Sequence, residues 1–148
     1  SLEQIVAAAK ELRTRAGDDS ALKLCRMFDL PLERLGLWER NLMRLARAAS
    51  SEPLPAATLC YVWDPSLPAG TVLPNAYSPR VRFWVLDGSG APLAAWRSHE
   101  RNIAADFLRA FGHESPTVPP LVAVVAGADS DNTGGSGLSY LGDIQLAP

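Results

Sequence analysis

The sequence predicts a mainly β, α+β protein, built as an antiparallel β-sandwich with helical insertions. Apolar segments of strand length recur along the chain and are separated by glycine, proline and aspartate turns. Helical periodicity occurs in three segments, which do not alternate regularly with the strands as they would in a doubly wound parallel sheet. The chain has 148 residues, 47% of them hydrophobic, which suffices for a sizeable core. We therefore expect a single domain over residues 1–148.

Two helices and one strand are expected in the first third of the chain. Apolar residues at helical spacing predict a helix over Leu2–Arg15, so that residues 1–15 form a helical N-terminal segment, which Gly17 ends. Apolar and polar residues alternate in Ala21–Phe28, as in a strand with one wet face. A second helix is expected over Leu32–Ala49, with its basic residues interpreted as a solvated face and anion binding as the alternative. Its apolar stripe consists of Leu35, Trp38, Leu42, Leu45 and Ala46.

The rest of the chain is expected to consist mostly of strands. Five segments have strand-like composition or alternation: Thr58–Trp63, Arg80–Leu86, Leu93–Trp96, Leu121–Ala128 and Leu138–Leu146. The proline-rich stretch Asp64–Pro79 reads as a long loop, and loops of that length in compact domains are often functional. A third helix is expected over Glu100–Phe111, because its apolar residues share one face and Gly112 follows as a cap.

An acidic, glycine-rich loop joins the last two predicted strands and is the leading candidate site. Within five residues it gathers carboxylate, amide and hydroxyl oxygens at Asp129, Asp131, Asn132 and Thr133. Such oxygens can bind a hard cation or hydrogen-bond a polar ligand. They also close turns through hydrogen bonds to the backbone. The loop is therefore interpreted as a ligand site, a calcium site or a structural turn.

The spacing of the loop excludes one type of calcium site. Gly134 occupies the sixth position counted from Asp129, where an EF-hand loop has glycine, but the twelfth position is Tyr140 instead of a bidentate glutamate. No flanking helices are expected either. A calcium site of another kind is an alternative, and no other cofactor is expected.

A second set of candidates lies near other predicted turns. These candidates for ligand contacts are Asp18, Asp19, Asn75 and Tyr77. Sugar rings stack on exposed aromatic side chains, so the position of each aromatic residue matters. Trp63 and Trp84 sit in apolar strands and are expected in the core, whereas Tyr77 and Trp96 are the better candidates for a ligand groove.

Composition excludes several classes of partner. A net charge of −2, from 14 basic and 16 acidic residues, gives no electrostatic case for nucleic acid or an anionic membrane surface. The longest apolar run, Pro119–Ala128, is too short to span a bilayer. The first residues lack the pattern of a signal peptide. Cys25 and Cys60 lie in predicted strands, where a disulfide is one interpretation; we favour buried free thiols, because cysteine packs as a small hydrophobe.

Several segments in this order resemble one protein family. They are Arg15–Asp19, Tyr61–Trp63, Leu67–Asn75, Glu100–Asn102, Asp106–Gly112 and Ala128–Gly135. Over roughly Arg13 to Leu146 the chain resembles the bacterial family called domain of unknown function 3047. The resemblance implies a periplasmic or secreted protein with a jelly-roll β-sandwich, and no established activity. The family has further strands upstream, which we expect to be replaced here by the helical segment or to have been cut away. A sandwich without them would have an uncovered edge, which favours pairing with another chain, as in a homo-oligomer, or a covering helix.

These observations lead to the hypothesis of a non-catalytic domain that binds a carbohydrate or a similar polyhydroxylated ligand. One alternative is an interaction or structural module that docks a partner through a sheet edge or through Leu32–Ala49. Another is a hydrolase that uses two carboxylates, one of them with a raised pKa. The motifs of serine nucleophiles and of dinucleotide binding are absent. A glycan is the expected partner; neither nucleic acid nor a membrane span is expected.

Overall fold

The computed structural model describes residues 4–14, 21–50, 54–129 and 137–147. Its elements, in chain order, are β1 (Gln4–Thr14), β2 (Ala21–Phe28), a 3-10 turn η1 (Leu32–Arg34), α1 (Leu37–Ala49), β3 (Ala57–Trp63), β4 (Val72–Pro74), β5 (Val81–Asp87), β6 (Trp96–Asn102), α2 (Ile103–Phe111), β7 (Leu121–Asp129) and β8 (Gly137–Ala147). The strands predicted for β2, β3, β5, β7 and β8 are confirmed.

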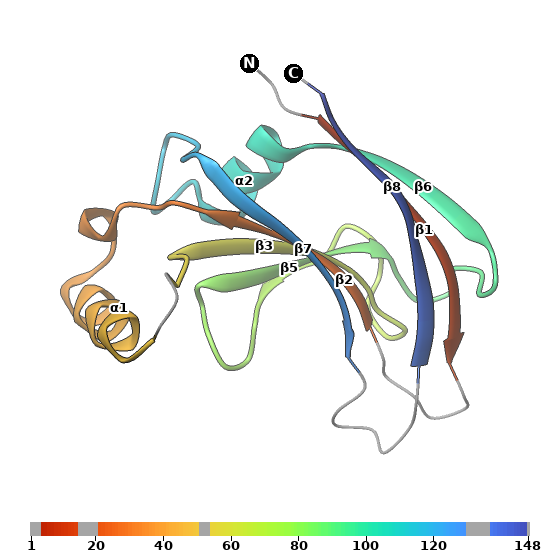
Figure 1. The fold of residues 1–148 in the computed structure, drawn as a ribbon, viewed down its shortest axis with the longest axis horizontal. Coiled ribbons are helices and arrows are strands. Elements are labelled where there is room, and N and C mark those ends of the chain that lie inside the picture. The colour runs from red at the N-terminus through yellow and green to blue at the C-terminus, as the bar shows by residue number, and fades with distance from the viewer. Residues whose placement is uncertain (1–3, 15–20, 51–53, 130–136, 148) are drawn as a thin grey trace.

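The strands form two sheets, and the fold is mixed α+β. A five-stranded sheet has the order β4-β5-β3-β2-β7, and a three-stranded sheet has the order β6-β1-β8. In Figure 1 the three-stranded sheet lies to one side of the larger sheet, while α1 lies at the opposite end of the molecule. The larger sheet is not purely antiparallel as expected, since β3 and β5 run parallel. The long connection Asp64–Arg80 allows this crossover, and β4 within it pairs antiparallel with β5.

The N-terminal segment is a strand, so the helix predicted for Leu2–Arg15 was wrong. β1 pairs antiparallel with β6 on one side and with β8 on the other, so that Val6 lies opposite both Glu100 and Gln145. Neighbours on both sides satisfy the hydrogen bonds of the backbone, and such tertiary context overrides the helix propensity of an alanine-rich segment.

Two other helix predictions need correction. Residues 100–102 belong to β6, and α2 begins only at Ile103, with Asn102 as its N-cap. The helix expected over Leu32–Ala49 is divided into η1 and α1, and no residue of α1 is buried. The predicted apolar stripe is therefore mostly outside the core: Leu35, which precedes α1, is buried, whereas Trp38 is 80% exposed.

The larger of two buried clusters lies on one face of the five-stranded sheet, called here the inner face, and a smaller cluster of Cys60, Val62 and Val85 lies on the other. Alternate residues of β2, β3 and β5 point to the inner face, among them Phe28, Tyr61 and Trp84. α2 covers it: the ring of Phe107 lies 4.7 Å from that of Phe28 and 5.3 Å from that of Phe111. The inner face is thus closed by a helix whose apolar side is buried.

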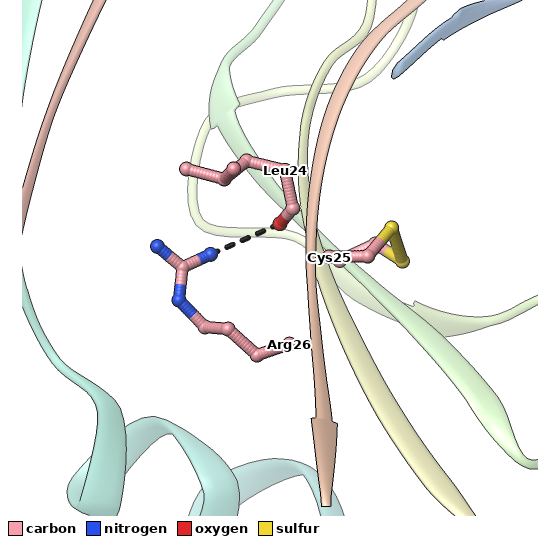
Figure 2. The surroundings of a disulfide bond; sticks show 4 residues. Leu24, Cys25 and Arg26 are labelled. Carbon is pink, nitrogen blue, oxygen red and sulfur yellow. Dashed lines mark hydrogen bonds between the residues drawn. A yellow bond between two sulfur atoms is a disulfide. The ribbon is translucent and has the colours of Figure 1, made fainter. Parts of the chain in front are cut away.

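The outer face of the same sheet carries a disulfide bond between Cys25 and Cys60. These residues are directly opposite one another in the β2–β3 ladder. Figure 2 shows Cys25 on one side of β2, and Leu24 and Arg26 on the other. The expectation of free thiols was wrong, because the bond depends on a strand register that the two sequence positions do not reveal.

Candidate ligand-binding site

A charged side chain lies in the core beneath the candidate site. Arg26 has no exposed surface, and its Nη1 donates to the carbonyl of Leu24 at 3.0 Å (Figure 2). Its guanidinium carbon lies 4.3 Å from the centre of the Tyr61 ring. Nε and Nη2 have no hydrogen-bond partner among the residues that the structure describes. Burial lowers the pKa of Arg26 to about 10, against the opposing influence of Tyr61 and Asp106, so the group stays charged at neutral pH.

Asp106 is the centre of the polar network above Arg26. Its buried carboxylate accepts a hydrogen bond from the Tyr61 hydroxyl and two from Arg101, from Nε at 2.9 Å and from Nη2 at 2.6 Å. The position in the first turn of α2 favours a carboxylate, and the Asn102 side chain caps this turn by accepting from the Ala105 amide at 3.0 Å. The geometry with Arg101 is the bidentate fork that holds both partners rigidly.

The network fixes the protonation of its members. Burial, followed by the hydrogen bond to Asp106, raises the pKa of the Tyr61 hydroxyl well above its ordinary value. The hydrogen bond to Asp106 outweighs partial burial and raises the pKa of Arg101. At neutral pH Tyr61 is therefore a neutral donor and Arg101 a cation.

An open pocket of about 600 Å³ lies beside this network. Its lining residues are Ala69, Gly70, Trp84, Val85, Leu86, His99, Arg101, Ala105, Asp106 and Arg109. Two guanidinium groups flank the buried indole of Trp84: that of Arg101 at 4.6 Å and that of Arg109 at 4.9 Å from the ring centre. Within the described part of the chain, Arg109 makes no ion pair or hydrogen bond, and it is exposed. We call this cavity the Arg109 pocket.

A histidine on β6 completes the polar side of the pocket. His99 Nε2 lies 2.7 Å from the carboxylate of Asp87, which also accepts from Arg97 Nε at 3.1 Å. Because Asp87 engages Nε2, Nδ1 is the ring nitrogen left for a ligand. The pocket therefore offers two guanidinium groups and one imidazole nitrogen.

A tight backbone contact shapes the part of the pocket that Ala69 and Gly70 line. A Cβ on Gly88 would lie 2.4 Å from backbone atoms of Leu67 and Ala69, so only glycine lets this loop approach β5 so closely. The loop is anchored further by the Gly70 amide, which donates to the Val85 carbonyl at 2.8 Å. Asp64 stabilises its start by accepting from the Leu67 amide at 2.9 Å. This part of the pocket is thus held by backbone contacts together with the packing of Leu67 against the cluster of Cys60, Val62 and Val85.

The residues predicted from the sequence lie elsewhere. Asn75 and Tyr77 line a second cavity of about 620 Å³, on the outer face between α1 and the sheet, which we call the outer groove. Asn75 Oδ1 accepts from the Tyr77 amide at 2.8 Å, and the Tyr77 side chain is 89% exposed, as expected. Asp129 is the last residue of β7. The remaining candidates lie outside the described residues: Asp18, Asp19, Asp131, Asn132 and Thr133.

The aromatic predictions have mixed outcomes. Trp84 is buried as expected, yet it lines the Arg109 pocket, whereas Trp96, although 50% exposed, is not among the lining residues of that pocket. Trp63, expected in the core, is only half-buried. Sequence reasoning missed the residues of the network and the Arg109 pocket, because they come from β2, β3, β6 and α2 and share no local motif. One signal was available: Arg26 occupies the apolar register of β2, between Leu24 and Phe28. A charge at such a position indicates a buried partner network.

Other site classes find no support in the described residues. In these residues, no group of three or more histidine, cysteine, aspartate or glutamate side chains is arranged to hold a metal ion. The loop predicted as a possible calcium site lies, beyond Asp129, outside the described residues. In the same residues no helix is long and apolar enough to cross a membrane.

Comparison with known proteins places the chain in a family. A family model described as "Protein of unknown function (DUF3047)" matches residues 2–145, nearly the whole chain. The chain belongs to this family, as its sequence motifs indicated. No curated protein and no solved structure matches it.

Proposed function

We propose that this member of the DUF3047 family is a non-catalytic domain that binds a carbohydrate or a similar polyhydroxylated ligand in the Arg109 pocket. One observation carries the proposal. Two guanidinium groups lie against the same indole, and Asp106 anchors only that of Arg101. The guanidinium of Arg109 keeps its N–H groups for the hydroxyl, carbonyl or carboxylate oxygens of a ligand.

The chemistry of the network supports binding over catalysis. Asp106 already accepts three hydrogen bonds, which leaves it little capacity as a base. The raised pKa of Tyr61 keeps its hydroxyl protonated. A carboxylate-dependent hydrolase, the alternative, needs a carboxyl group with a raised pKa. Asp64 and Glu114 show the opposite: burial alone would raise the pKa, but hydrogen bonds from Ser66 and Leu67 in one case, and from Arg80 and Arg82 in the other, lower it.

The proposal includes a location and a finer fold. We propose that the protein works in the periplasm or outside the cell, and that its two sheets form a sandwich of the jelly-roll type. The Cys25–Cys60 bond supports the location, because disulfides persist mainly in oxidising compartments. The family resemblance supports both.

Isothermal titration calorimetry with a panel of neutral and acidic oligosaccharides tests the site. Arg109→Ala should weaken the affinity for a bound glycan by about tenfold or more, since a charge-assisted hydrogen bond contributes about 1.5–3 kcal/mol. Arg34→Ala is the matched control, because Arg34 is an exposed arginine on η1. The Arg34→Ala variant should bind the glycan with the affinity of the wild type. If no glycan binds, or if Arg109→Ala binds as tightly as the wild type, the proposal is wrong.

A second variant separates this pocket from the acidic loop. Asp131→Ala should leave the affinity unchanged if the Arg109 pocket is the site. Loss of binding in Asp131→Ala, with normal binding in Arg109→Ala, would assign the site to the loop instead.

A further inference from the structure

α1 presents an uncovered apolar face. Four of its five large apolar side chains are exposed, Leu37 by 76%, Trp38 by 80%, Leu42 by 56% and Leu45 by 70%, while Met43 packs against the core. Scattered exposed hydrophobic residues are common, but a contiguous patch of them marks an interaction surface. Figure 1 shows α1 at the end of the molecule remote from the three-stranded sheet. This face is separate from the Arg109 pocket and does not involve the proposed ligand.

Two rows of side chains divide the surface of α1. Trp38, Leu42 and Leu45 follow the spacing i, i+4, i+7 and form an apolar row. Three arginines repeat the same spacing two residues later, which places them on the opposite side of the helix. They are Arg40, Arg44 and Arg47. The helix is therefore amphipathic, with an exposed apolar row of which Leu42 also borders the outer groove.

No acidic partner neutralises the arginine row among the described residues. Arg40 donates to the carbonyls of Leu32, Glu33 and Leu35, and Arg47 donates to the carbonyl of Leu54 at 2.9 Å. These bonds hold the helix in place without cancelling its charge. Glu39 is directed to Arg80, at 3.4 Å, away from the arginine row.

The charge of this segment differs in sign from that of the whole chain. Residues 32–49 contain four arginines and two glutamates, a net charge of +2, whereas the chain carries −2. The total charge therefore conceals a positive segment. A helix is about 10 Å across, which exceeds the Debye length of about 8 Å in physiological salt, so salt weakens the attraction between these arginines and an anionic surface and low ionic strength strengthens it.

We propose that α1 is an interfacial helix that binds the surface of a membrane containing anionic lipids. Its apolar row, with Trp38, enters the boundary between headgroups and acyl chains, and its arginines attract the lipid phosphates. A tryptophan and leucines on one side with arginines on the other are the composition typical of such helices. A second copy of the chain is the competing occupant, because two α1 helices could pair through their apolar rows with the arginines on the outside; the oligomeric state distinguishes the two.

Sedimentation with vesicles tests the proposal on the full chain. The protein should sediment with vesicles of equimolar phosphatidylglycerol and phosphatidylcholine, and less with phosphatidylcholine alone. The double variant Trp38→Ser/Leu45→Ser should lower the partition coefficient by about tenfold or more, because two side chains lose their apolar burial. Arg44→Glu should weaken binding to the anionic vesicles only. Trp96→Ser, which removes a half-exposed tryptophan on β6, remote from α1, is the matched control and should bind like the wild type.

Each contrary result overturns the proposal. It is wrong if the wild type stays in solution, or if the double variant sediments equally well while its circular dichroism shows it folded. It is also wrong if light scattering reveals a dimer that dissociates in the double variant, since the face would then belong to a second copy of the chain.

Discussion

The two helices of this protein are both amphipathic, but they use their apolar faces in opposite ways. In α2, Ile103, Phe107 and Phe111 have almost no exposed surface and close the inner face of the sheet. In α1 no residue is buried, and Trp38 is exposed by 80%. Periodicity thus predicts a helix and the side on which its apolar residues lie. Whether the protein itself covers that side depends on where the chain places the helix.

The contacts of the two helices with the sheet explain the difference. α2 is held by packing: the guanidinium of Arg82 lies 4.1 Å from the ring of Phe111 and also donates to the Ala110 carbonyl. In α1, only Met43 among the large apolar side chains packs against the core. Its polar contacts are those of Arg40 with the carbonyls of Leu32 and Leu35, beside η1, and that of Glu39 with Arg80. Removing apolar side chains should therefore affect the two helices very differently.

The largest effect is expected in α2. Phe107→Ala should lower the free energy of unfolding by about 3–5 kcal/mol, because the ring is fully buried between Phe28 and Phe111 and its loss leaves a cavity. Denaturant unfolding followed by circular dichroism measures the change. A loss below about 1 kcal/mol would show that α2 does not close the core.

The stability of the outer face, which α1 leaves partly open, should depend instead on the disulfide bond between Cys25 and Cys60. Replacing both cysteines, Cys25→Ala/Cys60→Ala, should lower the free energy of unfolding by about 2–4 kcal/mol, since the bond joins residues 35 apart in the chain. Unfolding of the double variant and of the wild type in the same denaturant measures the effect. Equal stability would mean that packing alone holds β2 to β3.

The carboxylate of Glu114 should make a smaller, pH-dependent contribution to the free energy of unfolding. Glu114 accepts from Arg80 and Arg82, whose positive charges outweigh its burial and lower its pKa below the ordinary 4.5. The ion pairs therefore stabilise the fold above that pH, and the contribution disappears as pH falls through the lowered pKa.

Glu114→Gln accordingly tests this contact. At neutral pH it should cost about 1.5–3 kcal/mol, the usual range for hydrogen bonds to charged groups. The difference from the wild type, measured by denaturant unfolding across a pH series, should shrink below about pH 4.5. A difference that stays constant down to pH 2 would contradict the assignment.

The smallest effect is expected in α1. Leu45→Ala should change the free energy of unfolding by less than about 0.5 kcal/mol, because the side chain is 70% exposed. The same denaturant experiment as for Phe107→Ala measures it. A loss of 2 kcal/mol or more, typical of buried leucines, would show that this helix packs against the protein.

Much of the fold could be predicted from local patterns. Alternating and apolar segments placed β2, β3, β5, β7 and β8, and the periodicity of Phe107 and Phe111 placed α2. Contacts distant in sequence decided the rest. β1 is a strand because β6 and β8 pair with it, and its alanine-rich sequence carries no sign of those neighbours. The disulfide likewise follows from the register that sets Cys25 opposite Cys60.

The candidate site could be predicted much less well. Its residues lie far apart in the sequence, so no motif joins Tyr61 to Asp106, 45 positions away. The acidic loop was visible because its polar residues are consecutive, whereas the Arg109 pocket exists only once β5, β6 and α2 are together. Sequence patterns thus reveal polar residues that are consecutive, as in the acidic loop, but not a site whose residues come from several strands and a helix.

The fluorescence of Trp38 tests most directly whether the apolar face of α1 is uncovered. The difference between the emission spectra of the wild type and Trp38→Phe, in dilute lipid-free protein, isolates this residue from the other tryptophans. We expect a spectrum typical of an indole in water, with free quenching by acrylamide, because the side chain is 80% exposed. A blue-shifted and protected Trp38 would contradict the account, since the protein itself would then cover the face that we assign to a membrane.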